Sequence, residues 1–156
     1  KIDYRRTATT VSMVNYHFVF CPRYRRKIFL IDSLETRFKE LVNQICEQND
    51  IRILAMGVTS TSELVCELPA KTAPADVMRL VKTNTAKHLM SEFKEFERTH
   101  NLWTRSYFVS TAGDVSSEII QKYVESQKTD ITRGETLQTT IQIKLLPNRE
   151  QRSILK

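Results

Sequence analysis

The sequence predicts an α+β domain of the ferredoxin-like kind, an antiparallel sheet with two helices on one face and an extra C-terminal helix. Segments with strand composition and segments with a helical apolar stripe alternate in the order β-α-β-β-α-β, and a further helical segment follows them. The chain has 156 residues, of which 40% are hydrophobic, enough for the core of one domain plus an additional segment. Because this plan is common, it says little about function by itself.

The first strand and the first helix are predicted on either side of a basic loop. Residues 11–20 (VSMVNYHFVF) are rich in β-branched and aromatic side chains, which predicts a central strand covered on both faces. The loop CPRYRRK follows it. Asp32 or Ser33 can cap the first helix, and residues 49–50 end it. The apolar stripe of this helix consists of Leu34, Phe38, Leu41, Val42, Ile45 and Cys46.

A β-hairpin is predicted next. Residues 51–58 form its first strand, residues 59–60 its turn and residues 61–68 its second strand. Successive side chains of the second strand point to opposite faces of the sheet. Leu64, Cys66 and Leu68 lie on one face, and Glu63, Val65 and Glu67 lie on the other. We expect Cys66 to be a small core residue, and Thr61 and the two acidic residues to lie on a solvated face.

The second half of the pattern repeats the order helix, strand, helix. Pro74 lies near the first turn of the second helix, and residues 105–111 (RSYFVST) predict the fourth strand. A turn at residues 113–114 leads to a third helix over residues 115–127. The stripe of the second helix is Val77, Leu80, Val81, Asn84, His88, Leu89 and Phe93.

The charge is concentrated at the N-terminal end. The whole chain has a net charge of +6, and the first 30 residues, with seven basic side chains against Asp3, have the same net charge. Such a block, with Tyr24 among its arginines, indicates a polyanion partner and favours nucleic acid. The open face of the predicted sheet can receive single strands, although the aromatic strand motifs of RNA-binding versions are absent.

Membrane and disulfide-rich classes do not fit the composition. No run of about 18 apolar residues exists, so no membrane partner is expected. The three cysteines are scattered without CxxC spacing, which suits a reducing cytosol. We therefore expect a bacterial-type cytosolic protein associated with the nucleoid.

Three parts of the chain are expected to be distinct. Residues 1–128 form the domain described above. Residues 129–140 are polar and lack a stripe, which predicts a linker. Residues 141–156 (IQIKLLPNREQRSILK) alternate, turn at a proline and begin a helix, which suggests the start of a second domain.

Four phrases of the sequence resemble one known family. NYHFVFCPRYRRK, PADVMRLVKTNTAKHLMSEF, LWTRSYFVST and GDVSSEIIQKYVESQ, in this order, resemble the single-tyrosine HUH transposases of the TnpA type. The resemblance covers roughly residues 4–128. It implies a dimer with the ferredoxin-like fold that binds imperfect hairpins at the ends of single-stranded insertion-sequence DNA.

The resemblance also implies a chemistry. A helix tyrosine attacks a phosphodiester and forms a 5′-phosphotyrosine link, and this role falls on Tyr123. Mg²⁺ or Mn²⁺ polarises the phosphate, held by two strand histidines and by a polar residue one helical turn after the tyrosine, here Gln127. Positions i and i+4 share one helix face, so this pair is geometrically consistent.

The histidine pair of the family has no counterpart. The stretch STSELVCELPAK stands at its place and puts Thr61 and Glu63 at the histidine positions, and no histidine occurs between His17 and His88. We therefore expect no bound cofactor and an inactive protein whose metal site has decayed. Glu63 with Gln127 remains a weak candidate pair for Mg²⁺ or Mn²⁺, to which Thr61 would add a neutral hydroxyl.

The last 16 residues resemble the opening of TnpB-type RNA-guided nucleases. This resemblance implies that the chain is the transposase-like front of a fused polypeptide. A guide RNA, held by the nuclease, would then be a further partner.

Three functional hypotheses follow. The first is a DNA-binding and dimerising module without catalysis. The second is an active single-strand transposase that uses Tyr123 with a rebuilt metal site, and the third is an oligomerisation domain without DNA affinity. In the first, basic side chains contact phosphates and one ring stacks on a base; the residues are Arg23, Tyr24, Arg25, Arg26 and Lys27, extended by Arg79, Lys82 and Lys87.

Overall fold

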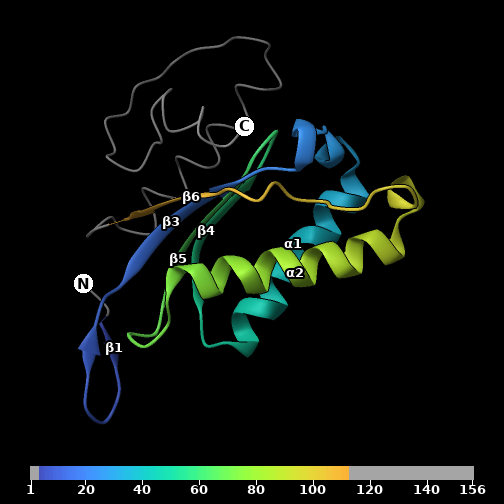
Figure 1. The fold of residues 1–156 in the computed structure, drawn as a ribbon. Coiled ribbons are helices and arrows are strands. Elements are labelled where there is room, and N and C mark those ends of the chain that lie inside the picture. The colour runs from blue at the N-terminus through green and yellow to red at the C-terminus, as the bar shows by residue number, and fades with distance from the viewer. Residues whose placement is uncertain (1–3, 113–156) are drawn as a thin grey trace.

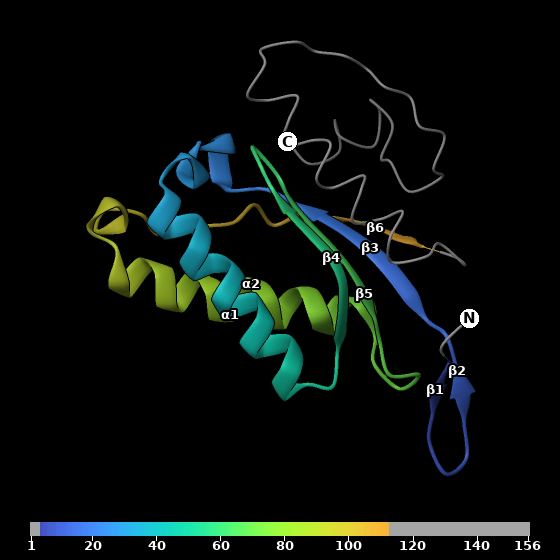
Figure 2. The ribbon, with the colours of Figure 1, turned by 180° about the vertical axis from the view of Figure 1, so that it is seen from behind.

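The chain folds as a four-stranded antiparallel sheet with two helices on one face (Figure 1). The computed structural model describes residues 4–112. The strands of the sheet are β3 (Asn15–Phe20), β4 (Arg52–Val58), β5 (Ser62–Glu67) and β6 (Phe108–Thr111), and the helices are α1 (Asp32–Gln48) and α2 (Pro74–Glu92). Figure 2 shows from behind that both helices lie on the same side of the sheet.

The strand order confirms the ferredoxin-like prediction. The sheet runs β4-β5-β3-β6, so the first and third strands of the plan are central and antiparallel. The register of this central pair runs from Asn15 opposite Glu67 to Phe20 opposite Ser62. The predicted third helix, the linker and the start of a second domain lie outside the described residues.

The first and fourth predicted strands are shorter than predicted by several residues, and local hydrogen bonds explain both differences. The predicted first strand divides, because β2 (Val11–Ser12) pairs with β1 (Arg5–Arg6) in a separate hairpin. The predicted fourth strand begins at Phe108 instead of residue 105. The carbonyls of residues 104–106 accept hydrogen bonds from a lysine of α2, so they are bonded to the helix instead of to a neighbouring strand.

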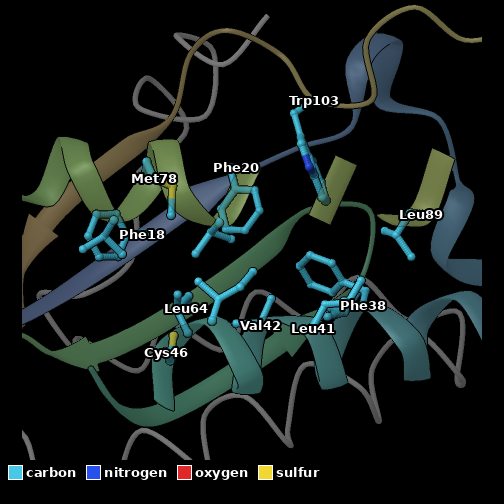
Figure 3. Packing of buried hydrophobic residues seen from close by; sticks show 14 of the residues in the cluster. Phe18, Phe20, Phe38, Leu41, Val42, Cys46, Leu64, Met78, Leu89 and Trp103 are labelled. Atoms are coloured by element: carbon cyan, nitrogen blue, oxygen red, sulfur yellow. The ribbon is translucent and has the colours of Figure 1, made fainter. Parts of the chain in front are cut away.

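The core lies between the helices and the sheet and is rich in aromatic side chains (Figure 3). Trp103 packs against Phe20 and Phe38, with ring centroids 5.0 and 5.5 Å apart. Its indole Nε1 donates a hydrogen bond of 3.0 Å to Oγ1 of Thr85 on α2. Buried aromatic pairs add stabilisation beyond the area they bury. The indole therefore ties the segment before β6 to both helices.

The other face of the sheet corrects one prediction. The sequence pattern predicts that Glu63 and Glu67 face solvent, but their exposed fractions are 6% and 3%. A buried carboxylate needs a charged or hydrogen-bonded partner. Glu67 has two, since Arg5 Nε lies 2.8 Å from its Oε1 and Arg52 Nη1 lies 3.3 Å from its Oε2. Compensation of this kind allows an acidic residue to remain in the centre of the sheet.

The cysteines lie in the interior of the domain. Cys66 is fully buried in the core cluster, as predicted, and the three cysteines are buried and form no disulfide. Burial raises the pKa of Cys46 to about 12, which keeps this thiol protonated and unreactive. Within residues 4–112 no helix is long and apolar enough to cross a membrane.

Phe38→Ala should lower the free energy of unfolding by about 3–5 kcal/mol, because it removes a fully buried ring that touches three other aromatic rings. Denaturant unfolding followed by the fluorescence of Trp103, the single tryptophan, measures this directly. Leu30→Ala, at an exposed apolar position, is the control and should change stability by no more than about 0.5 kcal/mol. Equal effects of the two substitutions would contradict the described core.

Candidate nucleic-acid interface

The basic loop after β3 is held in one shape by backbone hydrogen bonds. It contains the short helix η1 (Arg23–Arg25), and the Arg23 amide donates to the Leu102 carbonyl at 2.8 Å. The Arg25 amide donates to the Pro22 carbonyl at 2.9 Å, which closes a tight turn. Tyr24 and Arg25 have φ angles of 60° and 49°, in the left-handed region. Such residues cost about 1–3 kcal/mol each and cluster at functional sites.

This turn exposes an aromatic ring between guanidinium groups. The Tyr24 side chain is 74% exposed. The Cζ atoms of Arg23 and Arg26 lie 5.1 and 5.9 Å from its ring centroid, within range of cation–π attraction. Arg26 Nη1 also donates to Thr99 Oγ1 at 2.8 Å, so this guanidinium is anchored to the segment that follows α2. An exposed aromatic ring beside positive charge is a combination that binds single-stranded nucleic acid.

A pocket of about 1110 Å³ lies between this loop, α2 and the segment before β6. It brings together five of the predicted binding residues, Arg23, Tyr24, Arg25, Arg79 and Lys82. Arg26, Lys27 and Lys87 are not part of its lining. Sequence reasoning missed several other polar lining residues, Thr83, His100, Asn101, Thr104, Arg105 and Ser106. The phrase HNLWTRS, polar and basic around one tryptophan, was the available signal for them.

The lining cations differ in how accessible they are. Arg79 is paired with Asp76 at 3.1 Å on the exposed surface of α2, a contact that a phosphate can displace at low cost. Lys82 is different, because its Nζ donates to the carbonyls of Thr104, Arg105 and Ser106 at 2.7, 3.1 and 3.0 Å. Burial lowers the pKa of Lys82 to about 8. Its ammonium group is committed to the protein backbone.

The strand positions that correspond to the metal-binding histidines of the family carry other side chains in this chain. Glu63 Oε2 lies 3.5 Å from Nε2 of His17 on the neighbouring strand, and both side chains are buried. Nδ1 of His17 has no hydrogen-bond partner. Thr61 lies in the turn before β5, where its backbone pairs with that of Thr59. Tyr123 and Gln127 lie outside the described residues.

The described residues do not by themselves complete a divalent-metal site of the expected kind. Mg²⁺ takes about six oxygens in octahedral geometry, and Mn²⁺ also prefers carboxylate and water ligands. Glu63 supplies one carboxylate, and it faces an imidazole. Over residues 4–112 no group of three histidine, cysteine or acidic side chains lies close enough to hold a metal ion.

Comparison with known proteins decides the family. The family model described as "Transposase IS200 like" matches residues 10–127, well over half of the chain. The chain belongs to the IS200-like transposase family. This membership supports a DNA-binding role for this IS200-like transposase in the transposition of insertion sequences.

The relatives that match this chain are transposases of insertion sequences. The transposase of insertion sequence element IS200 from Salmonella typhimurium is 28% identical over 139 residues, which are 86% of this chain and 90% of the relative. The ISDra2 transposase TnpA from Deinococcus radiodurans is 26% identical over 121 residues, 75% of this chain and 86% of the relative.

Two solved structures have the same fold as this chain. One, from Deinococcus radiodurans and described as a transposase, is 25% identical with a TM-score of 0.64, and the match covers 79% of this chain and 97% of that one. The other is a REP-associated tyrosine transposase bound to a REP hairpin, 14% identical with a TM-score of 0.56 over 86% of this chain and 75% of that one. At 14% identity the second likeness concerns the fold alone.

Charge reversal in the basic loop should weaken the binding of DNA by this chain. Arg25→Glu and Arg26→Glu each replace a cation that we expect to bind phosphate. Removal of one such cation should also flatten the slope of log affinity against log salt by about 0.7–0.9. Fluorescence anisotropy with labelled hairpin-forming single-stranded DNA, at several salt concentrations, measures both quantities. Lys71→Glu, the same charge change on an exposed loop residue outside the pocket, is the control. Unchanged affinity of both loop variants at low salt would refute the assignment.

The ring of Tyr24 should contribute more to single-strand binding than its hydroxyl group does. Tyr24→Ala should weaken single-strand binding by about 1–3 kcal/mol, the usual effect of removing one stacking platform. Tyr24→Phe keeps the ring and should bind nearly as well as the unchanged protein. The same anisotropy titrations test this pair, and equal reductions in both variants would show that stacking does not contribute.

Proposed function

We propose that this chain is a DNA-binding and dimerising module that recognises single-stranded hairpin DNA of insertion-sequence ends and does not cleave it. The observation that supports this most directly is the pocket at the basic loop. It joins several cationic side chains to an exposed aromatic ring, and three separate segments of the chain build it. Phosphates are bound through the cations and unpaired bases through the ring, and a hairpin offers both.

Hairpin DNA is preferred to uniform duplex for a structural reason. A rigid duplex stacks its bases internally and leaves none for Tyr24, whereas a hairpin has a charged stem and an unpaired loop. The neighbour of the same fold bound to a REP hairpin supports this choice of ligand. An all-phosphate surface without an aromatic platform would instead favour duplex binding.

The replacement of the strand histidines supports the absence of cleavage. A tyrosine hydroxyl has a pKa near ~10, so attack on a phosphodiester requires a base or a metal-polarised phosphate. Glu63 puts a carboxylate at a histidine position of the family pattern, beside His17. Without a metal, a carboxylate repels the phosphate that Tyr123 would attack. We therefore assign Tyr123 as an ancestral nucleophile that is no longer used.

The module would act as a dimer and as part of a longer polypeptide. The family resemblance supports the dimer, and the TnpB-like phrase at residues 141–156 supports a fused RNA-guided nuclease with its guide RNA. Pairing two copies of that nuclease at the two ends of an element would give the inactive scaffold a role.

The second candidate is an active single-strand transposase. One observation favours it, namely that Glu63 is an oxygen ligand of the type Mg²⁺ and Mn²⁺ prefer and stands at a former ligand position. With Gln127 it would supply two protein ligands, and phosphate and water would supply the rest.

A denaturing gel distinguishes the two candidates. End-labelled hairpin DNA from the element ends is incubated with the protein in Mg²⁺, Mn²⁺ or EDTA, with Tyr123→Phe alongside. We expect no protein-linked band under any condition and, on a native gel with the same DNA, a shifted complex with both proteins. A linked band that needs metal and Tyr123 would show an active transposase.

Light scattering and the native gel test the remaining hypothesis of a purely oligomeric scaffold. A dimer that fails to shift hairpin DNA at low salt would exclude the proposed DNA-binding role. The wild-type protein mixed with duplex DNA of the same stem sequence is the matched control for hairpin preference.

A further inference from the structure

Lys82 has an unusual set of partners for a residue in a basic pocket. Its ammonium group has three N–H donors, and three successive backbone carbonyls, those of Thr104, Arg105 and Ser106, accept from them. No donor is left over for a phosphate. The side chain reaches from the middle of α2 to the segment that forms the opposite wall of the pocket.

The sheet holds this segment at one end only, where the Thr104 amide donates to the Cys21 carbonyl at 3.1 Å and Trp103 forms an isolated bridge with Pro22. β6 begins only at Phe108, so the carbonyls of residues 104–106 lack ladder partners, and backbone carbonyls away from water need donors. Lys82 supplies three, and Thr85, one turn further along α2, accepts from the Trp103 indole at 3.0 Å. Two positions one turn apart on α2 therefore hold the segment 103–106 through its carbonyls and its indole, in addition to the backbone contacts with residues 21–22.

We infer that Lys82 is a positioning residue for DNA binding, a clasp that fixes the wall formed by residues 104–106 and makes no phosphate contact itself. The inference rests on the proposed DNA-binding function. It replaces the sequence-based expectation that Lys82 extends the path of phosphate contacts. The clasp determines where the Thr104 and Arg105 side chains of the pocket lining stand relative to the basic loop.

The clasp should be sensitive to mildly alkaline pH. Burial lowers the pKa of Lys82 to about 8, and the nearby Cys21 thiol at the end of β3 opposes this shift. A neutral amine donates only two hydrogen bonds and turns a lone pair toward the third carbonyl. The other groups around it are the Tyr107 ring, 5.4 Å from Nζ, and the Arg79 and Arg105 side chains that line the same pocket.

The experiment compares Lys82→Met, Lys82→Arg and the unchanged protein by anisotropy with hairpin DNA over a salt series at pH 7. We expect Lys82→Met to bind roughly tenfold more weakly or worse, as for loss of a charged hydrogen-bond donor, with an unchanged salt slope. A phosphate contact would instead flatten the slope by about 0.7–0.9. Lys82→Arg, which stays charged, should keep most of the affinity.

A second readout does not involve DNA. Between pH 7 and pH 9 the emission of Trp103, adjacent to the clasped carbonyls, should shift in the unchanged protein and stay constant in Lys82→Arg. This arm remains informative if Lys82→Met does not fold. A flattened salt slope, unchanged affinity of Lys82→Met, or the same emission shift in Lys82→Arg would each overturn the clasp. Failure of the unchanged protein to bind hairpin DNA, with the emission shift present, would overturn the proposed function and with it the role of Lys82 in DNA binding, and would leave only the structural contact between Lys82 and the three carbonyls.

Discussion

The burial of one indole is the constraint on which the functional surface depends. Trp103 lies against rings from β3 and α1 and donates its only hydrogen bond to α2. The backbone beside it bridges to Pro22, at the start of the basic loop. A single side chain thus joins the end of the first strand, both helices and the approach to the last strand. The loop that exposes Tyr24 and the wall opposite it are two consequences of this one packing arrangement.

The two faces of the sheet differ in the kind of side chain that they bury. The helix face excludes water with apolar side chains, as any such fold does. The other face keeps ionisable groups buried, and each has an identifiable neighbour, Arg5 and Arg52 for Glu67 and His17 for Glu63. Removing one member of a buried ion pair destabilises the fold by more than the pair stabilises it, because the remaining charge is left in the interior without a partner. An imidazole on the adjacent strand explains how an acid can stand at Glu63 without disrupting the sheet.

Much of the fold could be predicted because apolar periodicity reports which side faces the core. The α1 stripe from Leu34 to Cys46 is buried as its spacing indicates. The burial of Glu67 could not be predicted, because its partner Arg5 is 62 residues away and only the folded sheet brings the two together. The split of the first predicted strand has a local cause instead, since β1 and β2 pair with each other in a hairpin.

At the candidate site, the types of residue could be interpreted from the sequence, but their arrangement in space could not. A cluster of arginines with a tyrosine indicated the basic loop, and five of the eight predicted binding residues do line one pocket. The sequence could not show that Lys82 turns its charge toward three carbonyls, because a lysine on an exposed-looking helix position resembles a free cation. His100 and Asn101 were missed because they stand in a loop without periodicity.

The guanidinium of Arg5 sets a practical boundary for the domain. It reaches Asp50 and the buried Glu67 from a hairpin whose first strand precedes residue 10, where the family match begins. A fragment trimmed to the matched region would keep every strand of the main sheet and still lose one of the two cations beside that acid. Expression clones and chimeras that carry this domain should therefore start before β1, because a boundary at residue 10, where the family match begins, would remove the salt bridges of Arg5.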